Sequence, residues 1–318
     1  MEKLVKGIHH VTIVTGDIQS TVDFYTGILG LKLIKKTVNF EDSKAYNLFF
    51  GTDEGKPGTY VTTLPYTNQL KQGRHGNGKV NTTAFSLDIA GLEYWMERLD
   101  NFSIDYKYPQ TRFGEEVVIY LEDFDGTGLE LIFNNKDVRA GVKNGVVPIE
   151  YSIKGLHHVE MWLDNPIKTI ALLNSQLGFK ILSEATNRMR LGIEDVPGSY
   201  IEIVTNMNVL SGWNGRGMVL TLTLDAVDEQ ALLQIEEGLK TIGVVSSMVK
   251  DRKYFKMITF TDANGIKFEI ATSLPGLTVD EPLDDLGTSL MLPRNWEDMR
   301  SFLSFSLADF STDMSRFR

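Results

Sequence analysis

The sequence GIHHVTIVTG at residues 7–16 has a near copy, GLHHVEMWLD, at residues 155–164. His158 lies 148 residues after His10, and the segments ILGLKLI and QLGFKIL, found a little further along, are related by the same offset. Two independent matches at one spacing indicate an internal duplication of the chain. The copies contain four of the five histidines as two adjacent pairs, so we examine the pairs as candidate functional residues.

Each half of the chain divides once more into a strand, an amphipathic helix and further strands. In the first unit, Asp17 can cap a helix that Gly30 ends. The apolar face of this helix comprises Ile18, Val22, Tyr25 and Leu29. The segment VNTTAFSLD has the alternation of a strand, LEYWMERL that of a helix, and EVVIYLED and GLELIFN again read as strands. The pattern predicts an α+β fold of four βαβββ units.

The domain boundaries follow from this repeat. We expect a first domain of two units at residues 1–138 and a second domain of two units at residues 155–274. Residues 139–154 lack periodicity and are predicted to be a linker. Residues 275–318 lie outside the repeat, and the segment WEDMRSFLSF within them is expected to form a short helix over a cavity or a dimer surface.

Composition narrows the function classes. The chain has 318 residues, a net charge of −10 and no cysteine. The negative charge disfavours nucleic acid, whose phosphates need clustered Lys and Arg. The absence of cysteine confines metal ligands to imidazole and oxygen. No apolar run reaches the roughly 20 residues of a membrane span, so we expect a cytoplasmic protein without a membrane partner and leave a homo-oligomer open.

Strand alternation selects one histidine of each pair. Val11 and Ile13 share a face with His9, so this face is the better candidate for the core, and His10 lies on the opposite face with Thr12. The second copy divides in the same way, with His158 and Glu160 opposite the apolar side chains. Late in each half, Glu130 and Glu269 alternate with apolar neighbours. An imidazole and a carboxylate in one cleft are two thirds of the two-histidine, one-carboxylate arrangement that binds ferrous iron.

The chain resembles the vicinal oxygen chelate superfamily, in particular the hydroquinone-type ring-cleaving dioxygenases of the glyoxalase-like group. The resemblance rests on GIHHVT, DFYTGILGLKLIKKTVNF, RFGEE, DRKYF and GIKFEIAT, in that order, and it covers nearly the whole chain. It implies two tandem glyoxalase/dioxygenase-like domains that form open barrels, with one metal, Fe(II) or Mn(II), between the first and fourth units. His10 and Glu269 would be two of its ligands.

The third ligand position departs from the family. Family members have a His-His pair after a Gly-x-Gly turn, where this chain has GRGMVLTLTLD, so that Leu220 and Thr221 occupy the two positions. Alternation places Thr221 in the cleft beside Thr223, and a neutral hydroxyl is a much poorer iron ligand than imidazole. The chain also has Thr259 where the family has a tyrosine near bound oxygen. It retains Arg252, which the resemblance places near the charged oxygen of the substrate.

A mirror-image site between the second and third units would use His158 and Glu130, and its third position is Ala84. Neither cleft therefore contains a full set of three ligands. His75 in the loop RHGNG, Glu160 or added waters could complete a site. The simpler reading of His75 is a solvated loop residue, and His9 and His157 read as packing or supporting groups, with His9 confined to packing.

Three functions remain open. The first, which we favour, is a metal-dependent ring-cleaving dioxygenase-like oxidoreductase acting on a small hydroquinone-like aromatic, with His10 and Glu269 as ligands, Thr221 at the third position, and Arg252 and Thr259 near the substrate. The second is a catalytically impaired protein of the same fold that binds a small aromatic or quinone. The third is a glyoxalase-type lyase or isomerase, which we rank last because such sites usually need four protein ligands.

Overall fold

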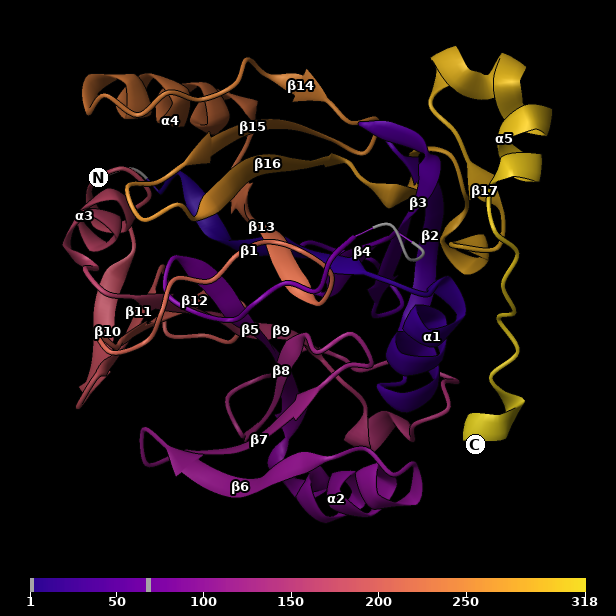
Figure 1. Cartoon of the computed structure of the whole chain (residues 1–318), viewed down its shortest axis with the longest axis horizontal. Helices are drawn as coiled ribbons and strands as arrows, with labels where there is room; N and C mark the ends of the chain where they lie inside the picture. The colour runs from indigo at the N-terminus through magenta and orange to yellow at the C-terminus, as the bar shows by residue number, and fades with distance from the viewer. Residues whose placement is uncertain (1–2, 67–69) are drawn as a thin grey trace.

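The structure, a computed structural model, describes residues 3–66 and 70–318, apart from the side chain of Lys44. Within these residues two curved sheets form, one above the other in Figure 1. The first sheet has the order β14 (Lys250–Asp251), β15 (Phe255–Thr261), β16 (Lys267–Pro275), β13 (Met218–Ala226), β1 (Val5–Thr15), β4 (Tyr60–Pro65), β3 (Asp42–Gly51), β2 (Lys32–Asn39) and β17 (Leu290–Met291). The second has the order β10 (Lys180–Ala185), β11 (Arg188–Gly192), β12 (Tyr200–Thr205), β9 (Gly155–Leu163), β5 (Lys79–Asp88), β8 (Gly128–Asn134), β7 (Glu116–Glu122) and β6 (Tyr106–Arg112).

The helices complete four βαβββ units in chain order, as the sequence predicts. They are α1 (Ile18–Val22), which continues as a π-helical turn over Asp23–Ile28, α2 (Leu92–Asn101), α3 (Ile167–Ser175), α4 (Glu229–Thr241) and α5 (Arg300–Ser306). Short 3-10 turns occupy Ile89–Gly91, Ile149–Tyr151, Leu277–Val279, Leu283–Asp285, Arg294–Met299 and Ser315–Phe317. The Asp17 side chain accepts a 2.8 Å bond from the Ser20 amide, and Gly30 turns the chain with φ +72°. Both caps act as predicted.

Each sheet combines units from both halves of the sequence. In the first sheet, β1 of the first unit pairs antiparallel with β13 of the fourth unit. In the second sheet, β5 of the second unit pairs with β9 of the third. The tandem fold predicted from the resemblance is confirmed, and the pairing brings residues near 10 and near 269 to the same sheet. The residue boundaries of the sequence domains stay a prediction.

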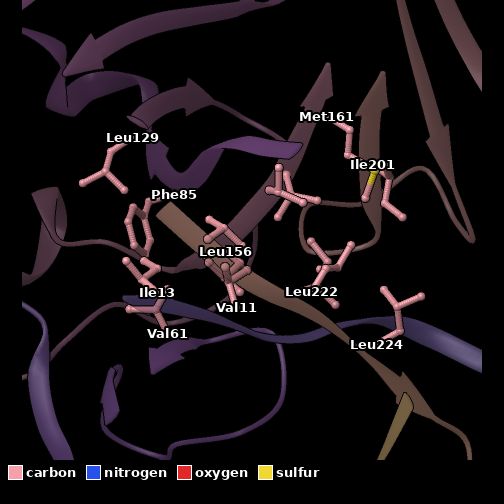
Figure 2. Packing of buried hydrophobic residues seen from close by; sticks show 14 of the residues in the cluster. Val11, Ile13, Val61, Phe85, Leu129, Leu156, Met161, Ile201, Leu222 and Leu224 are labelled. Carbon is pink, nitrogen blue, oxygen red and sulfur yellow. The ribbon is translucent and has the colours of Figure 1, made fainter. Parts of the chain in front are cut away.

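The hydrophobic core lies between the two sheets (Figure 2). Val11 and Leu222 from the first sheet meet Phe85, Leu156 and their neighbours from the second, and all four side chains are fully buried. Because strand side chains alternate, the residues between these core positions point to the opposite, concave face of each sheet. The core therefore fixes which polar residues line the two clefts.

The C-terminal segment packs along the outer edge of the first sheet, where Figure 1 shows it passing β2 and β3. Its strand β17 pairs in parallel with β2. Lys35 on β2 is fully buried, and its Nζ lies 2.8 Å from an Asp280 oxygen and 2.5 Å from a Glu281 oxygen. The predicted short helix is present as Arg294–Met299 followed by α5. This segment extends the edge of the first sheet and supplies the carboxylates that pair with its buried lysine.

A polar cleft with an incomplete metal-ligand set

The concave face of the first sheet encloses a cleft of about 1200 Å³, which we call the first cleft. Residues of β1, β3, β4, β13, β15 and β16 form its base and walls, and α3 and the segment after α4 form part of its rim. Its base contains His10, Thr221 and Glu269, and its aromatic wall contains Phe49 and Phe255. Side chains more than 200 residues apart in sequence thus line one space.

The Thr223 hydroxyl joins His10 to Glu269 at the base of this cleft. Thr223 faces His10 across the β1–β13 pair and Glu269 across the β13–β16 pair. Its Oγ1 lies 2.8 Å from Glu269 Oε2, to which it donates, and 3.3 Å from His10 Nε2. Thr221 lies two residues away from Thr223 on β13 and pairs with Thr12 instead of His10. Its Oγ1 is 3.4 Å from Glu269 Oε2. The sequence identified the right face but did not show that Thr223 would be the connecting residue.

The paired histidines contact each other. His9 Nδ1 lies 2.8 Å from His10 Nδ1, and the Tyr60 hydroxyl lies 3.0 Å from His9 Nδ1. A register shift between Ile8 and His10 accompanies this contact, so the expectation that His9 acts only through packing is wrong. Tyr60 also stacks on the His10 ring, with centroids 5.4 Å apart and planes 14° apart. The imidazole that faces the cleft is therefore held on two sides.

Burial controls protonation at the base. It lowers the pKa of His10 well below its usual range, and His9 lowers it further. Burial also lowers the pKa of His9 to about 3, although an interaction with the Thr272 backbone acts in the opposite direction. Burial also raises the pKa of Glu269, which the Thr223 hydroxyl opposes. Both imidazoles are neutral at pH 7.

The other two predicted site residues, Thr259 and Arg252, also line the cleft. Thr259 pairs with Glu269 across β15 and β16 and lines the wall. Arg252 also lines the cleft, and its guanidinium pairs with the exposed carboxylate of Glu41 and lies over the Phe40 ring, 5.4 Å from its centroid. A bulge in β13 brings Leu220 to the wall as well, beside Thr221. All five residues predicted for this site thus line one cleft.

Comparisons with known proteins bear on this arrangement. The sequence profile of the Glyoxalase/Bleomycin resistance protein/Dioxygenase superfamily matches residues 7–131. A protein of Bacillus subtilis (strain 168) named "Putative ring-cleaving dioxygenase MhqO" is 33% identical over 310 residues, which cover 98% of this chain and 98% of the relative. The chain belongs to this superfamily. The resemblance predicted from GIHHVT and the later motifs is confirmed.

Two further superfamily members extend the comparison. The "Chlorohydroquinone/hydroquinone 1,2-dioxygenase" of Sphingobium indicum is 26% identical and covers 96% of this chain and 97% of its own. A solved structure of a B. subtilis protein, also named as a dioxygenase, superposes with a TM-score of 0.92 at 32% identity, covering 98% of this chain and 99% of that one. These names support the expectation of an oxidoreductase.

The residues at the base do not fit the metal centre that the superfamily resemblance implies. His10 and Glu269 supply one imidazole and one carboxylate, and the third position holds the Thr221 hydroxyl. The Thr223 hydroxyl also donates a hydrogen bond to Glu269 Oε2. Across residues 3–66 and 70–318, no three His, Cys, Asp or Glu side chains are grouped to hold a metal ion. The expected Fe(II) or Mn(II) set is thus incomplete.

The mirror-image cleft on the second sheet, the second cleft, has a volume of about 260 Å³. Glu130 lines this cleft, and the fully buried His158 lies behind it, with its Nε2 3.3 Å from Glu130 Oε2 and with Ala84 opposite both residues. Arg112 binds Glu130 through two bonds of 2.6 and 2.8 Å. A guanidinium therefore holds the carboxylate that a metal would need.

Buried ion pairs continue behind Glu130. Glu202 is fully buried and accepts bonds from Arg190 of 2.9 and 2.5 Å. Arg190 also binds Glu116 through two 2.6 Å bonds, and Arg188 bridges Glu160 and Glu202. Burial alone would raise the pKa of Glu202, but His158 and the arginines around it outweigh burial and lower it to about 2. Glu160 is thus paired with an arginine, and its suggested role as a metal ligand stays a prediction.

The buried histidine His157 predicts that the protein loses stability in acid. Burial lowers the pKa of His157 to about 4, so between pH 6.5 and 4 the unfolded chain binds a proton that the folded chain does not. For His157 alone this costs about 2 kcal/mol at pH 5 relative to pH 7.5. Urea unfolding at the two pH values should show the lower midpoint at pH 5. A midpoint that is equal or higher at pH 5 would contradict the burial of neutral histidines.

His75 lies away from both clefts. Its Nε2 is 2.8 Å from the carbonyl oxygen of Gly126, and it lines neither cleft. The suggestion that it completes a metal site is wrong, because a loop-to-loop hydrogen bond already uses it. Among the helices of the described segments, none is long and apolar enough to cross a membrane. Cellular location stays a prediction.

Proposed function

We propose that the first cleft binds a small hydroquinone- or quinone-like aromatic. The observation that carries this proposal is the combination of a 1200 Å³ cleft, an aromatic wall and one polar cluster, His10–Thr223–Glu269, at its base. Apolar walls with a few convergent polar groups are typical of small-molecule sites. The name of the Sphingobium relative, which covers 96% of this chain, supports an aromatic of the hydroquinone class.

Ring cleavage is the second candidate, and the printed names of the full-length relatives favour it. In this chain it would require Fe(II) or Mn(II) held by His10, Glu269 and Thr221, with Arg252 and Thr259 near the substrate. The donor set lacks the second imidazole, so we derive no reaction step from it. Binding is the part of the function common to both candidates, and it is the part that the geometry supports.

A thermal unfolding experiment tests the proposal. Methylhydroquinone at about 100 times its Kd should raise the unfolding temperature by about 5 °C. Phe255→Leu removes an aromatic wall of the first cleft and should weaken binding, whereas Tyr108→Leu alters the second cleft and should leave binding unchanged. Absence of any shift with methylated, chlorinated and unsubstituted hydroquinones would refute the proposal.

An oxygen electrode separates the two candidates. Under the same conditions with added Fe(II), binding without oxygen uptake favours an aromatic-binding protein. Oxygen uptake that depends on methylhydroquinone and is lost in His10→Ala favours ring cleavage. Because His10→Ala also removes a buried ring that packs against Tyr60 and Phe255, its unfolding midpoint should be measured alongside.

A further inference from the structure

Two lysines of the first cleft have no partner in the described part of the chain. Lys168 on α3 and Lys267 on β16 both line the cleft, and both side chains are exposed. Among residues 3–66 and 70–318, neither ammonium group forms a hydrogen bond or an ion pair. Solvated lysines are common on protein surfaces, so a binding role requires that these two groups face one shared space.

Strand geometry directs Lys267 into the cleft. Lys267 and Glu269 are two residues apart on β16, so their side chains project from the same face of the sheet. Across the β15–β16 hairpin, Thr261 pairs with Lys267 and also lines the cleft. Two residues of a strand span about 7 Å. Lys267 and Thr261 therefore lie one step from the base of the cleft, at the turn that joins β15 to β16.

Contacts between α3 and this turn bring Lys168 to the same end of the cleft. The Thr169 hydroxyl donates to the Asp262 carboxylate, and Asn264 Nδ2 donates to Thr169 Oγ1 at 2.8 Å. The first turn of α3 is thus docked on the turn between β15 and β16. Because Lys168 directly precedes Thr169, it borders the same end of the cleft as Lys267. We call this part of the cleft the lysine end.

The carboxylates that line the cleft already have donors. Asp262 accepts a threonine hydroxyl and two backbone amides of its own turn. Glu41 pairs with Arg252 and with Lys250, and Glu269 accepts a threonine hydroxyl at the base. The described residues that line the cleft include four cations and three carboxylates, although the whole chain has a net charge of −10. The unpaired positive charge is therefore concentrated at the lysine end.

The cleft has room for a ligand that reaches from the base to the lysine end. Small-molecule sites typically have volumes of about 300–1000 Å³, and the first cleft exceeds this range at about 1200 Å³. Ala171 and Leu172 follow Lys168 by three and four residues, so they share its face of α3, and both line the cleft. An apolar surface thus lies next to the two ammonium groups.

We infer that the first cleft binds a hydroquinone-like aromatic that carries an acidic arm, meaning a short substituent that ends in a carboxylate, and that Lys168 and Lys267 bind this carboxylate. This inference rests on the proposed function and specifies its ligand class. The ring lies over the base beside the aromatic wall, and the arm extends toward the turn between β15 and β16. Ammonium groups without a protein partner bind a carboxylate through charge-assisted hydrogen bonds.

Calorimetric titration of the full chain with a matched pair of ligands tests the inference. 2,5-Dihydroxyphenylacetate and its methyl ester have the same ring and hydroxyl groups, but only the acid is charged at pH 7.5. In anaerobic buffer of low salt, the acid should bind about tenfold more tightly than the ester. NaCl at about 0.5 M should reduce this preference to about threefold, because salt screens exposed charges. Each titration is run with EDTA and again with Mn(II), so that metal at the base is tested separately.

Protein variants identify the source of the preference. Lys168→Met combined with Lys267→Met removes both charges and keeps side chains of similar length. This double variant should bind acid and ester with affinities within about twofold of each other, while the Kd of the ester stays unchanged. Lys107→Met alters a lysine of the second cleft and should leave the tenfold preference intact.

The possible outcomes separate the inference from the proposed function. Equal affinities of the natural chain for acid and ester, or a preference for the acid that persists in the double variant, would overturn the inference and leave the proposed function standing. If neither these two ligands nor methylhydroquinone binds under any condition, the proposed function itself is wrong.

Discussion

Thr221→His is expected to complete a metal-ligand set that is incomplete among the described residues of the natural chain. The imidazole would enter a roomy cleft beside His10 and Glu269 and complete two histidines and one carboxylate. Even a supporting contact changes metal affinity by 10–100-fold, so a direct ligand should raise affinity for Mn(II) or Fe(II) at least about 100-fold. After anaerobic loading and desalting, elemental analysis should find close to one metal per variant chain.

Two matched variants isolate the effect of the imidazole. Thr221→Val has the shape of threonine without its hydroxyl and should bind no more metal than the natural chain. Adding His10→Ala to Thr221→His should remove the gain. If the natural chain already retains near-stoichiometric metal, and His10→Ala abolishes it, then threonine suffices as third ligand and the incomplete-site interpretation fails.

Glu202→Gln is expected to have the largest effect on stability. The carboxylate is fully buried and binds Arg190 and Arg188, so its loss leaves buried guanidinium charge without its partner. Breaking a buried pair in this way typically costs about 3–5 kcal/mol in the free energy of unfolding. Urea unfolding at pH 7.5 measures this cost through the shift in midpoint.

Glu194→Gln provides the control. Glu194 pairs with Lys3 at the surface, where the two side chains are 57% and 45% exposed. Such pairs contribute at most about 1 kcal/mol, so its midpoint should barely move. Because the pKa of Glu202 is about 2 in the folded state, Glu202→Gln should also flatten the loss of stability between pH 4.5 and 2. Equal costs for the two variants would show that the second cleft is not a stabilising ion network.

The sequence was sufficient to predict the architecture and the faces of the strands. Alternation is a local rule, so the side on which His10 and Glu269 lie follows from their apolar neighbours. The internal duplication of the sequence predicted four βαβββ units in chain order. That β1 pairs with β13, and β5 with β9, depends on long-range pairing, and the family resemblance rather than any local pattern indicated the metal position between the first and fourth units.

The side-chain contacts within the clefts depend on strand register and bulges, which no local sequence pattern reveals. A register shift in β1 brings His9 to His10, and a bulge in β13 turns Leu220 to the cleft. The register of β13 against β16 makes Thr223, and not Thr221, the residue that joins the imidazole to the carboxylate. The arginines of the second cleft come from strands whose pairing the sequence did not reveal, so the ion network there was missed.

We propose that His10, Thr223 and Glu269 form the base of a ligand site whose described residues do not complete a metal centre. Crystals of the natural chain grown anaerobically with Mn(II) and hydroquinone test it, because anomalous scattering locates manganese directly. We expect no anomalous peak between His10 and Glu269, and a ligand hydroxyl within hydrogen-bond distance of His10 Nε2. A manganese peak bound by both side chains and by the ligand oxygen would contradict the account.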